Sequence, residues 1–195
     1  MANLIARKIW RIGGLIFPVI YITTDSQSIT SQCSFYVLVF FILIELLRFL
    51  NSNFNVWLFK RFRLILKEEE RHRFLNTTFF LLFLTITVWI FKKEVVIYSV
   101  FFIIFGDIAA SITGRYFGHI KIKNKTLEGT VAFWGICLVS GYLLNLLTPI
   151  KLPLIVIVIA GGVAAIVELF SIIDDNLSTG LASCIAMEIM LRIIY

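Results

Sequence analysis

The chain has 195 residues, of which 59% are hydrophobic, and its mean hydropathy is +0.95. This apolar share is far above that of an ordinary soluble domain, and apolar stretches recur along the whole length. The composition leaves no room for a separate soluble domain and predicts one polytopic, all-α membrane domain over residues 1–195. The net charge of +6 indicates orientation and contact with anionic lipid headgroups. Nucleic-acid binding is a poor explanation, because the charges lie in short loops between apolar segments.

Seven segments are candidates for membrane spans, each of which needs about 20 apolar residues. The first is short and contains Pro18, and no secretory cleavage pattern follows it, so we interpret it as an uncleaved span. Turn signals such as Thr24-Asp25-Ser26 and Thr148-Pro149 separate neighbouring segments. The expected spans are residues 9–24, 33–50, 74–91, 95–113, 129–147, 152–171 and 177–194.

The distribution of basic residues predicts how these spans are oriented. With the N-terminus inside, the cytoplasmic segments hold 14 of the 18 lysines and arginines, and the positive-inside rule then fixes the topology. This orientation places the 114–128 loop and the Asp174-Asp175-Asn176 turn on the same cytoplasmic face. The longest connection, 50–73, is expected to be a surface helix with Trp57, Phe59 and Phe62 in the headgroups, or else a solvated connector.

Cysteine and histidine give no sign of a metal or redox site. The three cysteines, Cys33, Cys137 and Cys184, have no CxxC spacing, and we expect them to be inert buried thiols. His72 and His119 stand in no metal-ligand pattern, so a zinc site is not expected.

Small residues recur every four positions at the end of the fourth span, at Gly106, Ala110, Gly114 and Gly118. If the helix continues that far, they form one smooth stripe, against which another helix can pack closely. Helix packing alone would explain this pattern. The same absence of side chains would also allow phosphate groups to approach the backbone.

A polar stripe of Asp107, Ser111 and Arg115 runs beside the small residues. A packing face does not need a carboxylate, and an aspartate at the membrane edge is costly, so it is a functional hypothesis by default. Carboxylate oxygens suit Mg²⁺, and a basic side chain neutralises the charge on a transferred phosphoryl group. The stripe therefore predicts a site for a metal-bound nucleotide triphosphate at the cytoplasmic edge of the bilayer.

The loop that follows adds Lys121, Lys123 and Lys125, which are either phosphate contacts or simply the orientation signal. Thr126 is placed to cap the fifth span, whose N-terminus at Gly129 would favour anions. Glu128 is either an ordinary first-turn residue or a second metal ligand. No GxxxxGK[ST] loop occurs in the sequence, so any phosphate cradle here is of another design.

These residues carry a resemblance to a known family. The pattern Gly106-Asp107-x-x-Ala110-Ser111-x-x-Gly114-Arg115-x-x-Gly118, followed by Lys125-Thr126-x-Glu128-Gly129-Thr130, resembles the signature of the CTP-dependent polyprenol kinases. That family includes dolichol kinase, phytol kinase and the CTP-dependent diacylglycerol kinases. A second match is Glu168 followed by Asp174-Asp175-Asn176-Leu177, and weaker ones are Glu45-x-x-Arg48 and Glu70-Arg71.

The sequence also departs from the family pattern. Arg11 stands in Arg7-Lys8-x-x-Arg11 where members often have histidine, and Asn124-Lys125 replaces a common lysine pair. Phosphatidate cytidylyltransferases, which also use CTP, share a similar first signature. They are usually longer and end in a Lys-Asp and His-Gly-Gly signature, of which this chain has no trace.

The resemblance implies a lipid kinase that transfers the γ-phosphate of CTP to the hydroxyl of a membrane lipid alcohol. The acceptor would be polyprenol or dolichol, a phytol-like isoprenoid or diacylglycerol, and Mg²⁺ would be held by Asp107 and Glu128. Asp174 or Asp175 would orient or deprotonate the acceptor hydroxyl, with the motif loops at 105–130 and 168–177. The nucleotide would contact Gly106, Ser111, Gly114, Arg115, Gly118, Lys121, Lys123, Lys125, Thr126, Glu128 and Gly129.

Other interpretations of the sequence stay open. One is a CDP-lipid synthase of the cytidylyltransferase kind, and another is a non-enzymatic transporter or scaffold, although a transporter should carry polar groups near the midplane. Without the resemblance, Asp174 and Asp175 would only form a turn, with Asn176 capping the last helix. We expect an integral membrane protein with a cytoplasmic site, in a prokaryotic cell membrane or, in a eukaryote, in the endoplasmic reticulum. The sequence does not indicate an oligomeric state.

Overall fold

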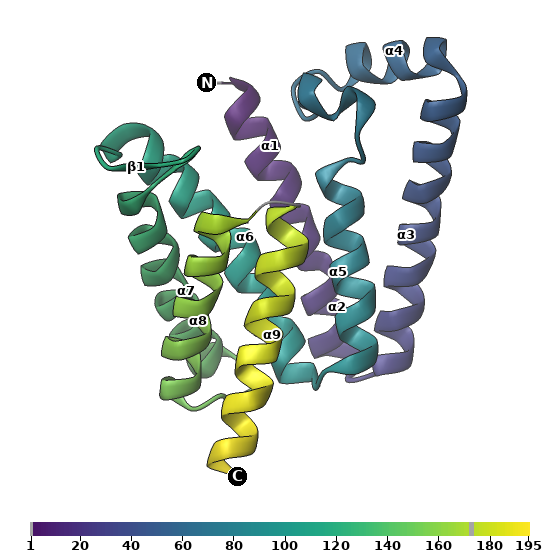
Figure 1. Cartoon of the computed structure of the whole chain (residues 1–195). Helices are drawn as coiled ribbons and strands as arrows, with labels where there is room; N and C mark the ends of the chain where they lie inside the picture. The colour runs from purple at the N-terminus through teal and green to yellow at the C-terminus, as the bar shows by residue number, and fades with distance from the viewer. Residues whose placement is uncertain (1, 172–173) are drawn as a thin grey trace.

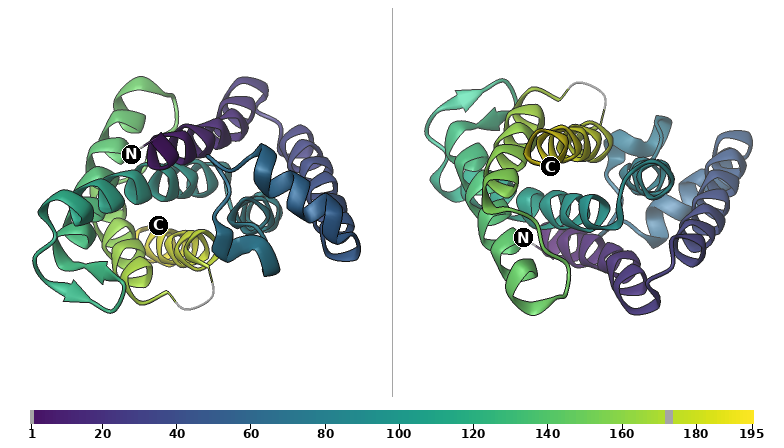
Figure 2. Two further views of the ribbon diagram at one scale, coloured as in Figure 1. Left: turned by 90° about the horizontal axis from the view of Figure 1, so that it is seen from above. Right: turned by 90° about the horizontal axis from the view of Figure 1, so that it is seen from below.

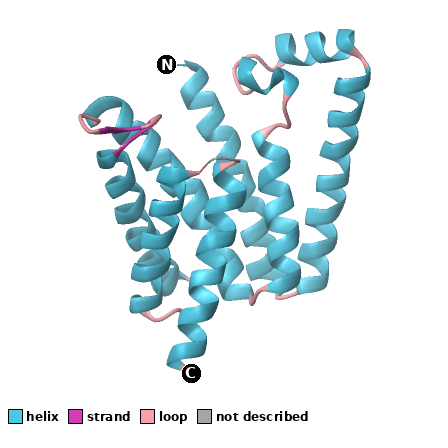
Figure 3. Ribbon diagram, in the orientation of Figure 1, coloured by secondary structure: helices cyan, strands magenta, loops and turns pink. Residues whose placement is uncertain are grey.

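The computed structural model describes the backbone of residues 2–171 and 174–195, and side chains from residue 6 onward within those ranges. The described part of the chain is a bundle of helices with one short β-hairpin (Figures 1 and 3). Its elements are α1 (Ala2–Ile12), η1 (Gly13–Leu15), α2 (Ile16–Thr24), α3 (Gln27–Leu50), α4 (Ser52–Arg61), η2 (Glu68–His72), α5 (Asn76–Ile90), α6 (Lys93–Phe117), β1 (Lys121–Ile122), β2 (Lys125–Thr126), α7 (Leu127–Leu147), α8 (Leu154–Phe170) and α9 (Asp175–Ile194).

The all-α prediction is confirmed, and each expected span corresponds to helical structure. Within the described ranges, α3, α6, α7 and α9 are long and apolar enough to cross a membrane, whereas α5 and α8 are shorter apolar helices. The first expected span is divided into α1, η1 and α2, with the break at Gly13 and Gly14. Large apolar side chains are exposed on several helices, such as Leu43 and Leu47 of α3, as expected for surfaces that face lipid. The count of seven spans stays a prediction.

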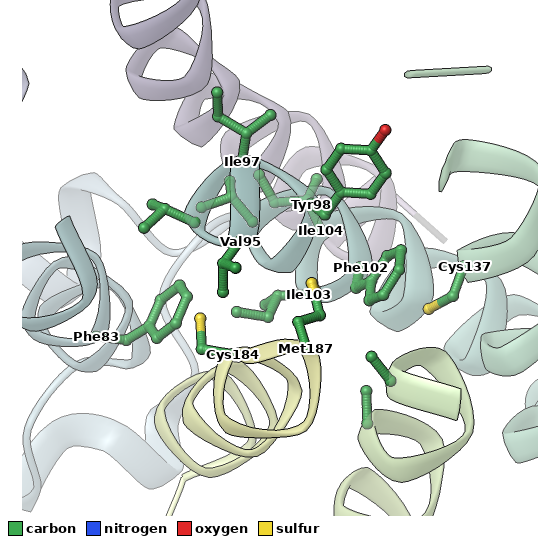
Figure 4. Close-up of a cluster of buried hydrophobic side chains, with 14 of the residues drawn as sticks. Phe83, Val95, Ile97, Tyr98, Phe102, Ile103, Ile104, Cys137, Cys184 and Met187 are labelled. Carbon is green, nitrogen blue, oxygen red and sulfur yellow. The ribbon is translucent and has the colours of Figure 1, made fainter. Parts of the chain in front are cut away.

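Helix α6 runs through the middle of the bundle, with α1 and α2 on one side and α9 on the other (Figure 2). Its first half is almost completely buried, and Figure 4 shows Ile103 close to Cys184 and Met187 of α9. Cys137 and Cys184 are both fully buried. The expectation of buried cysteines is therefore confirmed for these two, while Cys33 is only half-buried.

The small residues at the end of α6 are used for packing against α7. A Cβ atom built on Gly106 would lie 2.5 Å from the ring of Phe133, and one on Gly114 would lie 2.7 Å from Oγ1 of Thr126. On the other helix, a Cβ on Gly129 would lie 2.9 Å from the carbonyl oxygen of Ala110. The two helices thus approach each other along the stripe that the sequence predicts.

A buried charge network connects the end of α3 to the segment before α5. The guanidinium of Arg48 donates to the carboxylate of Glu45 and to the carbonyl oxygens of Glu70 and Arg73, the Glu70 bond being 2.8 Å long. Glu45 in turn accepts from the backbone N–H of Leu75 at 2.6 Å. Breaking the buried Arg48–Glu45 ion pair would be strongly destabilising. The network therefore fixes the position of residues 67–76 relative to α3.

The connection 50–73 contains a helix, α4, as predicted, but one of its three aromatic residues was placed wrongly. Trp57 and Phe62 are exposed, whereas Phe59 is 3% exposed, and its ring lies 5.5 Å from the Arg48 guanidinium. Phe59 therefore covers the buried charge network and does not enter the headgroup region. An aromatic face at this distance stabilises a buried guanidinium.

Candidate functional site

Asp107, near the end of α6, is ion-paired with two cations of α1. The Lys8 ammonium donates to Oδ2 of Asp107 and to its backbone carbonyl, and Nη1 of Arg11 lies 2.5 Å from the same Oδ2. Lys8 and Arg11 are three residues apart, so they share one face of α1. Burial lowers the pKa of Lys8 from its ordinary value, and the negative charge of Asp107 opposes this effect.

A second cluster joins the hairpin to the ends of α8 and α9. The Lys125 ammonium lies 2.7 Å from Oε1 of Glu168 and 3.0 Å from Oδ2 of Asp175. It also donates to the backbone carbonyl of Glu168 at 2.5 Å. Residues 172 and 173 of the predicted segment 168–177 lie outside the described residues.

Asp174 begins α9 as its N-cap. Its Oδ1 accepts from the backbone N–H groups of Asn176 at 2.8 Å and Leu177 at 3.2 Å, a capping arrangement. The interpretation in which Asn176 caps this helix is wrong, because α9 begins at Asp175 and the cap lies two residues earlier than expected. Burial raises the pKa of Asp174 above its ordinary value, although the two N–H groups oppose the shift.

The hairpin β1–β2 is too short for a strand signal in the sequence, which predicted only a loop there. Lys123 at its tip has a φ of 53°, in the left-handed region that favours glycine and asparagine. The side chains of Lys121 and Lys123 project from the hairpin and are exposed. Glu128 holds the two residues that precede β1, since its Oε1 accepts from the backbone N–H groups of His119 and Ile120 at 3.0 Å each.

The remaining predicted site residues have identifiable positions as well. Thr126 caps α7, as expected, by accepting from the N–H of Gly129 at 3.2 Å. Gly118 ends α6, and a Cβ there would lie 2.6 Å from Cγ2 of Thr126. Ser111 donates to the carbonyl of Ile108 at 3.1 Å, and the Arg115 residue is exposed.

A cavity of about 650 Å³ opens beside Asp107, among α1, η1, α2, α3, α5, α6 and the segment before α5. Asp107, Ser111 and Asn176 belong to its lining, together with Lys8 and Arg11. The hairpin lysines and Glu128 do not line it. Asp107 therefore lines this cavity, whereas Lys125, Glu168 and Asp175 do not.

The two predicted magnesium ligands differ in how well they fit that role. Asp107 offers the hard carboxylate oxygens that Mg²⁺ prefers, and at nucleotide sites this ion uses one or two carboxylates together with phosphates and water. Glu128 is held by backbone amides of the loop and is not grouped with Asp107. Over the described ranges, no three His, Cys, Asp or Glu side chains form a group that could hold a metal ion. Asp107 is thus a single carboxylate that is already paired with Lys8 and Arg11, and its binding of Mg²⁺ stays a prediction.

Lys8 and Arg11 are the residues of this region that the sequence did not assign to the site. The sequence attributed them to the orientation signal and to a family pattern from which Arg11 departs, and it gave them no role in the site. Their spacing on one helix face was visible, and a buried carboxylate such as Asp107 requires a cationic partner. Which of the many cations supplies it depends on contacts between residues 99 positions apart, which a single sequence does not show.

Comparison with known proteins gives three similar chains. An uncharacterized protein of Rickettsia prowazekii is 25% identical over 189 residues, covering 94% of this chain and 92% of that protein. CTP-dependent diacylglycerol kinase 1 of Saccharomyces cerevisiae is 27% identical over 100 residues, and that of Eremothecium gossypii is 28% identical over 102 residues.

The two kinase matches are partial. They cover 50% and 51% of this chain but 34% and 32% of the kinases, so the chain spans about a third of the length of each kinase. No protein-family model and no solved structure matches the chain. Along about half of its length, the chain is therefore similar to two CTP-dependent diacylglycerol kinases.

Proposed function

We propose that the protein is a CTP-dependent lipid kinase that phosphorylates a membrane lipid alcohol on the cytoplasmic side of the bilayer. In the reaction, the acceptor hydroxyl oxygen forms a bond to the γ-phosphorus of CTP, and the bond between this phosphorus and the β–γ bridging oxygen breaks. The hydroxyl proton is released, and the products are the lipid monophosphate and CDP. Such transfers require in-line positioning and charge neutralisation more than covalent chemistry by the protein.

The observation that supports this proposal is that Asp107, ion-paired with Lys8 and Arg11, lines a cavity with an apolar interior. A lipid hydroxyl must meet a triphosphate at a boundary between charged and apolar groups, where the chains remain in an apolar environment and the phosphates meet cations. The partial similarity to CTP-dependent diacylglycerol kinases supports the choice of nucleotide.

Each group in this region has a proposed role. Asp107 would hold Mg²⁺, which would supply neutralisation of the negative charge on the phosphates. Arg115, Lys121, Lys123 and Lys125 contact the phosphates, and Lys125 exchanges its contacts with Glu168 and Asp175 for them. Gly106, Gly114, Gly118 and Gly129 allow α6 and α7 to approach each other, so that the phosphate-binding loop begins at a fixed point. Glu128 positions that loop through His119 and Ile120, and its direct contact with the metal stays a prediction.

Asp174 and Asp175 are the proposed candidates for orienting or deprotonating the acceptor hydroxyl. Asp174 is buried and has a raised pKa, which makes it a stronger base once it is ionised. Asp175 is held by Lys125, and it becomes available when that lysine turns to the nucleotide.

The proposal is tested by incubating the purified protein with γ-³²P-labelled CTP, Mg²⁺ and one lipid alcohol at a time. The panel contains diacylglycerol, dolichol, a shorter polyprenol and phytol. Label that appears on one lipid supports the proposal and identifies the acceptor. If no alcohol is labelled, but pyrophosphate is released when phosphatidate is supplied, the protein is a cytidylyltransferase and the kinase proposal is wrong.

A further inference from the structure

The cavity beside Asp107 has two chemically different ends. Apolar side chains of four elements line its interior, namely Phe17, Val37, Phe41, Phe80, Ile103 and Ile104. Its volume of about 650 Å³ is in the range of pockets that hold organic ligands. A site that bound only a nucleotide phosphate or an ion would not need this apolar interior.

The other end of the cavity is charged, with an excess of cations. Arg7, Lys8, Arg11 and Lys67 line it, against the carboxylates of Asp107 and Glu70. Glu70 already accepts from the backbone N–H groups of Lys67 at 3.0 Å and Asn76 at 3.4 Å, which satisfy part of its hydrogen-bonding capacity. The end is therefore suited to an anion that carries more than one negative oxygen.

The cavity also reaches the apolar outside of the bundle. Two of its lining residues, Trp10 and Ile16, are 46% and 58% exposed, and they lie on the two helices that surround the break at η1. Gly14 in this break is packed closely, because a Cβ there would lie 2.9 Å from the Phe80 ring. Part of the cavity wall next to the η1 break is thus formed by side chains that also face the outside of the bundle.

We infer that this cavity is the binding site of the acceptor lipid, and that its cationic end holds the phosphomonoester of the product. That the bound lipid is the acceptor rests on the proposed function, whereas the binding of a lipid with a phosphomonoester headgroup does not. The chains lie along Val37, Phe41 and Phe80, and the headgroup meets Lys8, Arg11 and Lys67. Before phosphoryl transfer, the headgroup of the acceptor ends in a hydroxyl, and Asp107 contacts the oxygen of this hydroxyl.

The inference is tested by lipid binding in the absence of CTP. Dioleoyl phosphatidate and dioleoylglycerol are titrated into detergent-purified full-length protein, and bound lipid is counted by native mass spectrometry. Parallel titrations with inorganic phosphate and with CTP as competitors show whether the cationic end selects the lipid headgroup or any phosphate. We expect saturable binding of phosphatidate, which inorganic phosphate at equal concentration does not displace.

Two variants and one control locate the binding site. Val37→Trp places an indole in the cavity and should weaken the binding of both lipids about 10-fold or more. Lys67→Gln removes a charge that repels Lys8, so the fold should persist, and phosphatidate binding alone should weaken about 3- to 10-fold. Val139→Trp, on a side chain of α7 that is 52% exposed and outside the cavity, should change neither affinity.

The outcomes separate this inference from the proposed function. If γ-label from CTP is transferred to a lipid, but Val37→Trp and Val139→Trp bind lipid equally, the kinase stands and the cavity assignment is wrong. If the binding pattern is as expected and no lipid is labelled, the cavity assignment stands and the kinase proposal fails. Displacement of phosphatidate by inorganic phosphate would overturn the assignment of a lipid phosphomonoester.

Discussion

The sequence identifies Asp107 as a candidate site residue, but it does not show which cations pair with it. A carboxylate at the end of an apolar helix is costly without a partner, so the sequence alone identified Asp107 as a functional candidate. Glu168 and Asp175 were singled out only by the resemblance to the CTP-dependent polyprenol kinases. Their partners, Lys8, Arg11 and Lys125, come from distant parts of the chain. The sequence predicted Lys125 as a phosphate contact and did not assign Lys8 or Arg11 to the site, and it paired none of the three with a carboxylate, because charge pairing between helices is a tertiary property.

Replacing Asp107 by asparagine should abolish most of the activity. Asparagine has nearly the same shape but lacks the charge, so it neither holds Mg²⁺ firmly nor pairs with Lys8 and Arg11. We expect lipid phosphorylation to fall by about 100-fold or more, measured as initial rate at saturating CTP. Asp25→Asn is the matched control, because Asp25, which follows α2, is exposed and pairs with Lys93 at the start of α6. Equal rates in the two variants would contradict the role of Asp107.

Asp174→Asn and Asp175→Asn separate a catalytic carboxylate from a structural one. Asparagine is as good an N-cap as aspartate, so Asp174→Asn should leave the thermal unfolding temperature almost unchanged. If Asp174 is the base, the rate should fall about 100-fold or more, and the loss of activity at acidic pH should disappear. That acidic loss should lie at a higher pH than for an ordinary aspartate, because the pKa of Asp174 is raised and the base must be ionised. A normal rate in Asp174→Asn would leave Asp175 as the candidate.

At the scale of elements, periodicity predicted the helices well and the connections less well. The four-residue spacing of small residues predicted the close contact that α6 makes with α7. The hairpin was missed because its strands are two residues long, which is too short for an alternating pattern. Phe59 was misplaced because an aromatic residue in a basic connection is compatible with both a membrane surface and a buried guanidinium. Only the position of Arg48 decides between them.

The contact between α6 and α7 makes Gly106 sensitive to the smallest substitution. A methyl group at Gly106 would lie 2.5 Å from the buried ring of Phe133, and overpacking of this kind costs about 1–3 kcal/mol. Gly106→Ala should therefore lower the free energy of unfolding by that amount, measured by denaturation in detergent micelles. Gly135→Ala is the control, because a Cβ there has no atom within 4 Å. Alanine at Gly135 should be neutral or stabilise α7 by up to about 1 kcal/mol, and a larger loss there than at Gly106 would refute the packing assignment.

The whole molecule has two ends of different character. The N-terminus, the hairpin and α4 lie at one end, and the connection between α2 and α3 and the C-terminus lie at the other (Figure 1). The sequence placed five of the seven apolar segments close to their observed bounds, but it missed the break at η1 and began the second segment at residue 33, whereas α3 begins at Gln27. The cavity could not be predicted, because it is formed by α1, α3, α5 and α6 together. Such a volume depends on how helices pack, and not on the pattern within any of them.

The orientation of these two ends in the membrane is open to a direct measurement. In a background without native cysteines, Lys123→Cys places a thiol at the tip of the hairpin and Lys151→Cys places one between α7 and α8. By the positive-inside rule, a membrane-impermeant maleimide should label Lys123→Cys only in inside-out vesicles and Lys151→Cys only in intact cells. The reverse pattern would place the site on the outer face, away from cytosolic CTP.

The position of the label in CTP tests the kinase reaction most directly. Purified protein is given the identified acceptor lipid with either γ-³²P-CTP or α-³²P-CTP, and the lipid fraction is counted in each case, with Asp107→Asn as the inactive reference. A kinase transfers only the terminal phosphoryl group, so we expect label in the lipid from γ-labelled CTP and none from α-labelled CTP. Label in the lipid from α-labelled CTP would mean that the cytidylyl group is transferred, and it would contradict the proposed function.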